Sequence, residues 1–376
     1  MISTQKLHRF ILLAFVGFAL FFGENSFAVV PTSYRVAHPI GGMHMLPPGE
    51  VPGWDNNFWL VYEMSHANIW NAPFTMENLK TGDTLTYTAD YEQSYGNLEI
   101  GGAITPKIGL SFELPYAYRA GGGLDHMIDA FHLLINSDRY NREFYSTNQM
   151  NFSITKNGEE QIVPGSYNEG SGNFKTKLKI WWWKNLGKTK GSCPCGFATS
   201  FHVKAPTTTT PSAWTSGTFD YTFMMHLGIP MGSASAFWWT SSVTHLGENI
   251  LFEDWPRNDW PQMHEMSYDF AIDKNWGFLM QIRMESPLFD GNQLAIVDST
   301  ASEKEFILHR MASGWNSLIH WRGSQSLGFR YRSTNSQLNM LFLEDWGPGT
   351  YDENGDDTYV TNAPDVGVAL QYAFSF

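Results

Sequence analysis

Apolar and polar side chains alternate along many short segments of this chain. The clearest case is residues 364–376, where six large apolar residues share one parity: Val366, Val368, Leu370, Tyr372, Phe374 and Phe376. Successive side chains of a β-strand point to opposite faces, so this strand has one apolar face and one small, weakly polar face. Such a strand is typical of a barrel wall with lipid outside and a crowded or hydrated lumen inside.

The same alternation predicts further strands along the chain. They cover residues 57–70, 84–104, 109–119, 174–183, 196–205, 219–229, 236–246, 264–273, 277–288, 324–333 and 338–346. Single-chain bacterial barrels have an even number of strands, and we therefore predict about twelve, within a range of about 10–14.

Short and long connections alternate between these strands. The tight turns are TPKI, GSAS, DKNW and STNS, whereas residues 120–171, 247–263, 289–323 and 347–363 are long. Short turns on the periplasmic side and long loops outside are typical of bacterial barrels. We predict an all-β fold, a transmembrane antiparallel up-and-down β-barrel with one short helix in a long loop. A soluble β-sandwich is the alternative, but its exposed aromatic surface would favour aggregation.

The start of the chain has the pattern of a secretory signal peptide. A basic beginning and an apolar stretch over residues 10–22 precede small residues up to Ala28, which predicts a signal peptide over residues 1–28. We expect residues 29–56 to form a periplasmic N-terminal segment and residues 57–376 to form the barrel. The five prolines of residues 29–56 exclude one regular strand, so this segment is either a flexible arm or is tucked into the barrel mouth.

Composition agrees with an exported membrane barrel. Aromatic residues make up 15% and charged residues 16% of the chain, whose formal net charge is −13. Many rings and few charges suit a wall with aromatic girdles, and the acidity argues against a nucleic-acid partner. We predict the cell outer membrane as location, with its lipid and the barrel insertion machinery as partners and no cofactor. Cys193 and Cys195 are interpreted as a turn disulfide or two unused thiols, because two sulfurs supply only half of a zinc site.

The strand register also predicts which charged side chains face the lumen. Two interpretations stay open: cationic residues attract anions into a water-filled pore, or mixed charges cross-link a closed interior. The residues are Lys175, Lys177, Lys179, Arg119, Glu113, Asp220, Arg283, Arg330 and Arg332.

The longest loop contains the sequence RAGGGLDHMIDAFHLLINSDR. Its apolar residues recur at helical spacing, which predicts a short amphipathic helix over residues 124–135 that packs on the inner wall or caps the mouth as a gate. Asp125, Asp129 and His132 share another face of this helix. They form a solvated face, a weak metal site, or a base with an orienting carboxylate.

A second weak metal candidate lies in the acidic loop TYDENGDDTYV. Asp352, Asn354 and Asp356 place oxygen ligands at alternating positions, as calcium sites do. Acidic surface loops are more often simply solvated, so we treat both interpretations as open.

The strand FELPYAY, the following GGGLDHMIDAFH and the final PDVGVALQYAF resemble a family of Gram-negative outer-membrane proteins that is catalogued as a domain of unknown function. The resemblance is specific around residues 112–139. It implies a barrel in the outer membrane and brings no established activity.

We predict a passive, porin-like channel or uptake pore for small solutes with a loop-gated lumen. One alternative is an outer-membrane lipid hydrolase, for which the candidate arrangements are His132 with Asp129, or His245 and His226. No G-x-S-x-G motif occurs, and we assign no catalytic residue. The other is a structural or adhesion barrel whose aromatic loops bind a partner. Conductance, lipid turnover and surface binding distinguish the three.

Overall fold

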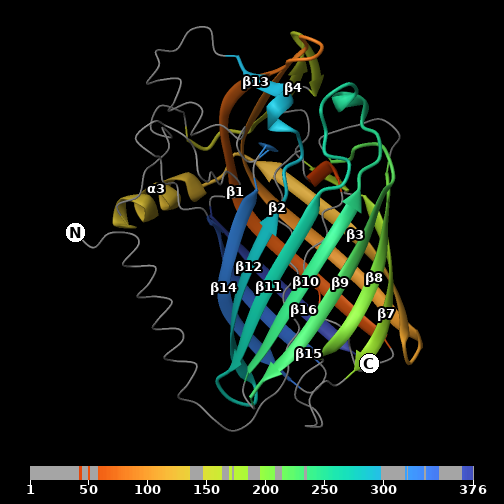
Figure 1. Ribbon diagram of the computed structural model, residues 1–376. Helices are drawn as coiled ribbons and strands as arrows, with labels where there is room; N and C mark the ends of the chain where they lie inside the picture. The colour runs from red at the N-terminus through yellow and green to blue at the C-terminus, as the bar shows by residue number, and fades with distance from the viewer. Residues whose placement is uncertain are drawn as a thin grey trace.

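The computed structural model describes residues 42–44, 50, 58–135, 147–162, 169–171, 173–184, 195–207, 214–232, 235–297, 318–319, 321–333, 336–346 and 366–375. Twelve of its antiparallel strands close into a barrel, because β1 pairs with both β16 and β2 (Figure 1). This confirms the predicted fold. The wall strands are β1 (Phe58–Asn78), β2 (Thr84–Thr105), β3 (Ile108–Ala120), β7 (Phe174–Lys184), β8 (Gly196–Ala205), β9 (Asp220–Met231), β10 (Ser235–His245), β11 (Gln262–Ala271), β12 (Trp276–Glu285), β14 (Arg322–Arg332), β15 (Ser336–Trp346) and β16 (Val366–Ser375).

Smaller elements gather at one end of the barrel, which we call the long-loop end (Figure 1). The opposite, short-turn end carries the turns β2–β3, β9–β10, β11–β12 and β14–β15. Strand β1 runs to Asn78 and not to residue 70 as predicted, because residues 84–90 of β2 continue to pair with it. The smaller elements are α3 (Leu124–Ile135), β4 (Asn151–Lys156), β5 (Glu159–Ile162), β6 (Glu169–Ser171), η2 (Ile250–Phe252), η3 (Gly291–Gln293) and β13 (Leu294–Ile296).

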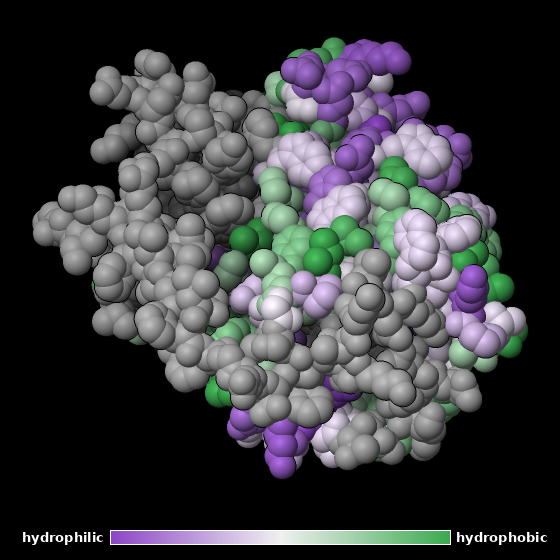
Figure 2. Space-filling view, turned by 60° about the horizontal axis from the view of Figure 1, so that its bottom comes forward, coloured by the Kyte–Doolittle hydropathy of each residue, from purple (hydrophilic) through white to green (hydrophobic). Residues whose placement is uncertain are grey.

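The outer face of the wall is apolar and exposed. Leu114, Phe223 and Leu370 are 52%, 45% and 46% exposed, and they share this face with Tyr62, Met64, Phe112, Tyr116, Phe201, Tyr221, Met266, Phe329, Met340, Phe342, Val368 and Tyr372. In Figure 2, green hydrophobic residues lie among white and pale ones in the centre and at the right of the view, whereas the largest group of purple hydrophilic residues lies at its upper edge. A continuous apolar surface of this kind requires an apolar environment.

No helix among the described residues is long and apolar enough to cross a membrane.

A packed apolar cluster lies at the long-loop end. It joins Ile69 and Tyr87 of β1 and β2 to Phe152 of β4 and to residues of the loops after β10 and β12, including Phe252 and Phe289. Tyr87, Phe152 and Phe289 are at most 2% exposed. These side chains come from the sheet extension and from three separate connections, and we call this cluster the roof.

A second apolar cluster lies inside the wall near the short-turn end. Trp59 and Trp181 are its large members, and both are at most 5% exposed. A Cβ added to Gly101 would lie 2.3 Å from the Trp59 ring, so the indole occupies space that only a glycine leaves. Many inward side chains between this cluster and the roof are polar or charged, and Leu279, Leu341, Leu343 and Ala369 form a further buried apolar cluster there.

Helix α3 forms as its periodicity predicts, but its N-terminal turn packs outside the barrel. Asp125 Oδ1 accepts a hydrogen bond from Asn68 Nδ2 at 2.9 Å, and the backbone N–H of Leu124 donates to Glu92. Asn68 and Glu92 have the same outward parity as exposed Met64. The helix therefore lies beside the wall (Figure 1), and the prediction that it caps the mouth or packs on the inner wall is wrong.

The described residues of the N-terminal segment lie inside the barrel. Met43 belongs to the apolar roof, and His44 and Glu50 contact strands β9, β7 and β10. Of the two placements that the sequence left open, these residues support the one within the barrel and not a free periplasmic arm.

Candidate functional site

Strand β7 carries the central feature of the lumen, a row of lysines at every second position. Lys175, Lys177 and Lys179 all point inward and are at most 8% exposed, as strand alternation requires. Lys177 is paired with Glu50 of the N-terminal segment, and its Nζ also lies 3.0 Å from Glu99 Oε1 and 3.7 Å from Glu113 Oε1. Lys179 Nζ lies 2.8 Å from Glu50 Oε2.

Strand β10 fixes the backbone of Glu50. The hydroxyl of Thr240 donates to the Glu50 carbonyl at 2.9 Å and accepts from the Glu50 N–H at 3.2 Å. Burial alone would raise the pKa of the Glu50 carboxyl, but the ammonium groups of Lys177 and Lys179 outweigh it and hold that pKa well below its ordinary value. Glu50 is therefore an ionised residue held at three points in the lumen.

Two histidines and a serine line the wall beside this cluster. Ser200 Oγ lies 2.8 Å from Nε2 of both His202 and His226. His202, Glu50 and Glu113 also bring ligand atoms within 4.8 Å of one another, a spacing that suits a metal ion. The Lys177 ammonium already contacts both of these carboxylates, so the donors present fit an ammonium group better than a metal.

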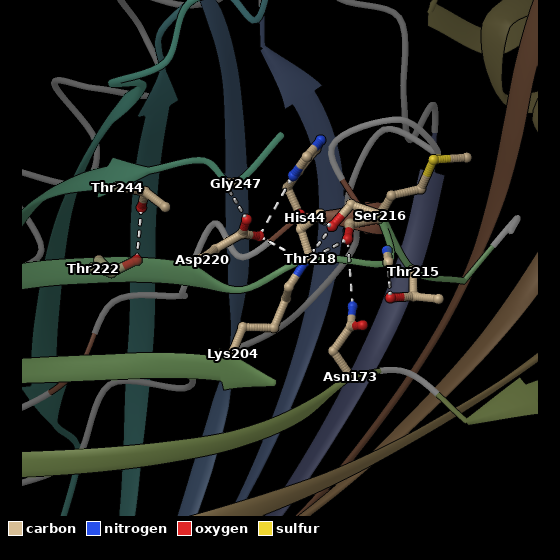
Figure 3. A network of polar contacts seen from close by, with 12 residues as sticks. His44, Asn173, Lys204, Thr215, Ser216, Thr218, Asp220, Thr222, Thr244 and Gly247 are labelled. Carbon is tan, nitrogen blue, oxygen red and sulfur yellow. Dashed lines mark hydrogen bonds and ion pairs between the residues drawn. The ribbon is translucent and has the colours of Figure 1, made fainter. Parts of the chain in front are cut away.

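A second network binds the N-terminal segment near the long-loop end (Figure 3). Lys204 Nζ lies 2.7 Å from Asp220 Oδ2, and both side chains are fully buried. His44 Nδ1 lies 3.4 Å from the same Asp220 oxygen. The Met43 carbonyl accepts from Lys204 Nζ and from the Ser216 N–H, both at 3.1 Å. We call strands β7–β10, with these contacts to Met43, His44 and Glu50, the segment-paired side of the lumen.

The remaining charged part of the wall pairs with itself. Arg283 Nε donates to Glu285 at 2.7 Å, and Arg322 is ion-paired with the same carboxylate. Arg330 Nη2 lies 3.4 Å from Asp269 Oδ1, with both side chains at most 2% exposed. We call strands β11, β12 and β14 the self-paired side, because these ion pairs need no residue from outside the wall.

The lumen residues expected from the sequence divide between these two sides. Lys175, Lys177, Lys179, Glu113 and Asp220 lie on or next to the segment-paired side, and Arg283 and Arg330 lie on the self-paired side. Arg119 instead lies under the roof, with its guanidinium 3.9 Å from the Trp214 ring and 4.9 Å from the Phe152 ring. Arg332 is half-buried at the short-turn end, where its N–H donates to the Asn275 carbonyl. Their role in selectivity remains a prediction.

The candidate metal ligands are only partly described. Asp125 is held by hydrogen bonds from Asn68 and from the Asn148 N–H, so it anchors the helix. Asp129 is half-buried on α3, and the side chain of His132 lies outside the described residues. Four further residues also lie outside the described residues: Asp352, Asn354, Asp356 and Cys193. Cys195 is disulfide-bonded.

Sequence reasoning missed Glu50, the residue on which the segment-paired side converges. The sequence does hold one signal for this contact. Glu50 is an acidic residue in a proline-rich segment that precedes the wall, and the wall carries an inward row of lysines with the opposite charge. Thr240 was also missed, because a threonine of correct parity in a strand carries no signal of its own.

A family model described as "Protein of unknown function (DUF3187)" matches residues 55–294. The chain belongs to this family. The resemblance found in the sequence is thus supported at the level of the family.

No match is found among curated proteins. Among solved structures, the chain is similar to the COG4313 outer membrane channel from Pseudomonas putida F1, with 10% identity, a TM-score of 0.48 and coverage of 88% of this chain and 100% of that one. It is also similar to the Ralstonia pickettii toluene transporter TbuX, with 6% identity, a TM-score of 0.36 and coverage of 92% and 96%. A Pseudomonas aeruginosa FadL homologue shows 7% identity, a TM-score of 0.36 and coverage of 94% and 100%.

Proposed function

We propose that this DUF3187 protein is an outer-membrane channel for small anionic solutes, and that its N-terminal segment closes the lumen in the present conformation. The exposed apolar face of the wall supports a position in a membrane. The polar lumen supports passage of hydrophilic solutes, and the lysines of β7 supply an attraction for anions.

The pairing of Lys177 and Lys179 with Glu50 carries this proposal. Glu50 belongs to no wall strand, so the segment can leave while the hydrogen-bonded wall remains closed. Its departure would remove one carboxylate from between two lysines and leave the segment-paired side more positive. In this proposal, closure by the N-terminal segment takes the place of the predicted gate at Asp125, Asp129 and His132, because the N-terminal turn of the helix packs outside the wall.

Single-channel recording in planar bilayers tests this function. We expect openings of the refolded wild type to prefer anions, and Lys175→Glu/Lys177→Glu/Lys179→Glu to weaken or reverse that preference. The triple variant reverses three charges, so the change in ion preference reports on charge selectivity, and the conductance recorded alongside it reports on pore width. A folded barrel that never conducts, even when residues 29–56 are deleted, would contradict a channel.

The placement of the histidines does not favour a lipid hydrolase. His226 and its partner Ser200 are at most 2% exposed and lie within the lumen, away from the lipid-facing surface. His245 packs against Trp260, with ring centroids 4.5 Å apart. A lipid hydrolase needs its nucleophile and base where a lipid ester can reach them.

A further inference from the structure

The Glu50 side chain occupies a site built by other elements of the chain. Its two carboxylate oxygens face two different ammonium groups: Oε1 pairs with Lys177, and Oε2 lies 2.8 Å from Lys179. The Thr240 hydroxyl hydrogen-bonds both backbone groups of the same residue. Lys177, Lys179 and Thr240 belong to the wall, so the site persists when Glu50 is removed.

We propose that Lys177, Lys179 and Thr240 form a binding site for carboxylate solutes, and that Glu50 is an internal ligand which competes for it. This inference rests on the proposed channel and names the class of solute that the channel takes. The two lysines form ion pairs with the carboxylate of the solute. The Thr240 hydroxyl forms hydrogen bonds with an amide or hydroxyl group of the same solute. A solute with both groups reproduces the contacts that a glutamate residue makes.

The surrounding charges favour a single negative charge on the ligand. Glu99 Oε1 and Glu113 Oε1 lie 3.0 Å and 3.7 Å from the same Lys177 Nζ, so both carboxylates border the site. A ligand with two negative charges, such as a phosphate dianion, would meet their repulsion at close range. A carboxylate monoanion instead replaces the charge that Glu50 already supplies.

The size of the site can be probed with a matched pair of small molecules. Glu50→Ala removes Cγ and the carboxylate, which are the atoms of an acetate ion. Acetate should therefore fill the gap in this variant, whereas neutral acetamide of nearly the same size should not. Glu265→Ala is the matched control, because Glu265 lies on the self-paired side near Arg283 and Gln281.

Isothermal titration calorimetry on the full folded chain in detergent measures the competition. We expect Glu50→Ala to bind acetate at least about tenfold more tightly than the wild type, and Glu50→Ala/Lys179→Gln to lose at least about tenfold again. Glu265→Ala should bind acetate as the wild type does. Heat-modifiable migration on gels verifies that each barrel is folded.

Equal acetate binding by the wild type and Glu50→Ala would overturn the carboxylate site, as would equal binding of acetate and acetamide by Glu50→Ala. Recording currents from the same variants separates this inference from the channel itself. If Glu50→Ala conducts without gaining acetate affinity, the site is wrong and the channel stands. If it gains acetate affinity without conducting, the site stands and the channel is wrong.

Discussion

The two charged sides of the lumen satisfy their buried groups in different ways. On the self-paired side, Arg283 and Arg322 share Glu285, and all three residues belong to the wall. On the segment-paired side, Lys177 and Lys179 share Glu50, which belongs to the N-terminal segment and not to the wall. A buried charge must keep a partner or regain water. Without the segment, the self-paired side keeps these ion pairs. The segment-paired side loses the Glu50 carboxylate and becomes more positive, although Lys177 keeps its wall partners Glu99 and Glu113. This difference locates where the lumen can open.

Deleting residues 29–56 should produce the largest effect. It removes Glu50, His44 and the Met43 carbonyl, and so exposes Lys177, Lys179 and Lys204 to water. We expect a large rise in conductance and an anion preference of about tenfold or more at low salt. Reversal potentials in a salt gradient measure the preference, and raising the salt concentration should reduce it. Unchanged conductance would show that the segment does not obstruct the lumen.

On the self-paired side, Glu285→Gln should cost stability without opening the lumen. The change removes the negative partner of Arg283 and Arg322, and breaking a buried ion pair costs about 3–5 kcal/mol of unfolding free energy. Urea titration of folding into lipid vesicles, followed by tryptophan fluorescence, measures the loss. A rise in conductance as large as that from the deletion would remove the distinction between the two sides.

Acidification should release the segment through Glu50. The pKa of this carboxyl is held well below its ordinary value of 4.5, so the ion pairs contribute stability above about pH 4.5 that is lost as the pH falls through the folded pKa. Glu99 and Glu113, beside Lys177, and His202 and His226, which also face Glu50, border the same position. We expect wild-type openings to increase below about pH 4.5, with a smaller increase in Glu50→Gln. If the wild type and Glu50→Gln showed the same increase in openings at low pH, groups other than Glu50 would cause that increase.

The smallest effect is expected for an ion pair outside both sides of the lumen. Arg257 Nη2 lies 2.8 Å from Asp259, whose side chain is 54% exposed. Asp259→Asn should change the unfolding free energy by less than about 1 kcal/mol, because water screens exposed pairs. The same urea titration checks this value. A larger loss would show that loop charges, and not burial in the lumen, dominate the stability of the barrel.

The sequence predicted the wall well because lipid and lumen impose opposite demands on alternate residues. That constraint placed Lys175, Lys177 and Lys179 inward and Leu370 outward, and the structure agrees. It carries no information about segments that are neither strand nor helix. Glu50 therefore could not be placed from the sequence, since its position depends on contacts with β7 and β10 far along the chain.

Helix α3 shows the same limit in another form. Its 3.6-residue period predicted the helix, but the side that it packs against depends on Asn68 and Glu92. These residues lie in parts of β1 and β2 whose pairing continues toward the long-loop end. Local periodicity establishes that an element forms, whereas its docking depends on partners that are distant in the sequence.

The most direct test of the account makes the same substitution on each side of the lumen. Glu50→Gln and Glu265→Gln both replace a buried carboxylate with an amide of the same shape, and single-channel recording compares them with the wild type at neutral pH. We expect Glu50→Gln to open more often or more widely than the wild type, and Glu265→Gln to behave as the wild type does. Identical behaviour of the two folded variants would contradict the claim that the N-terminal segment closes the lumen through Glu50.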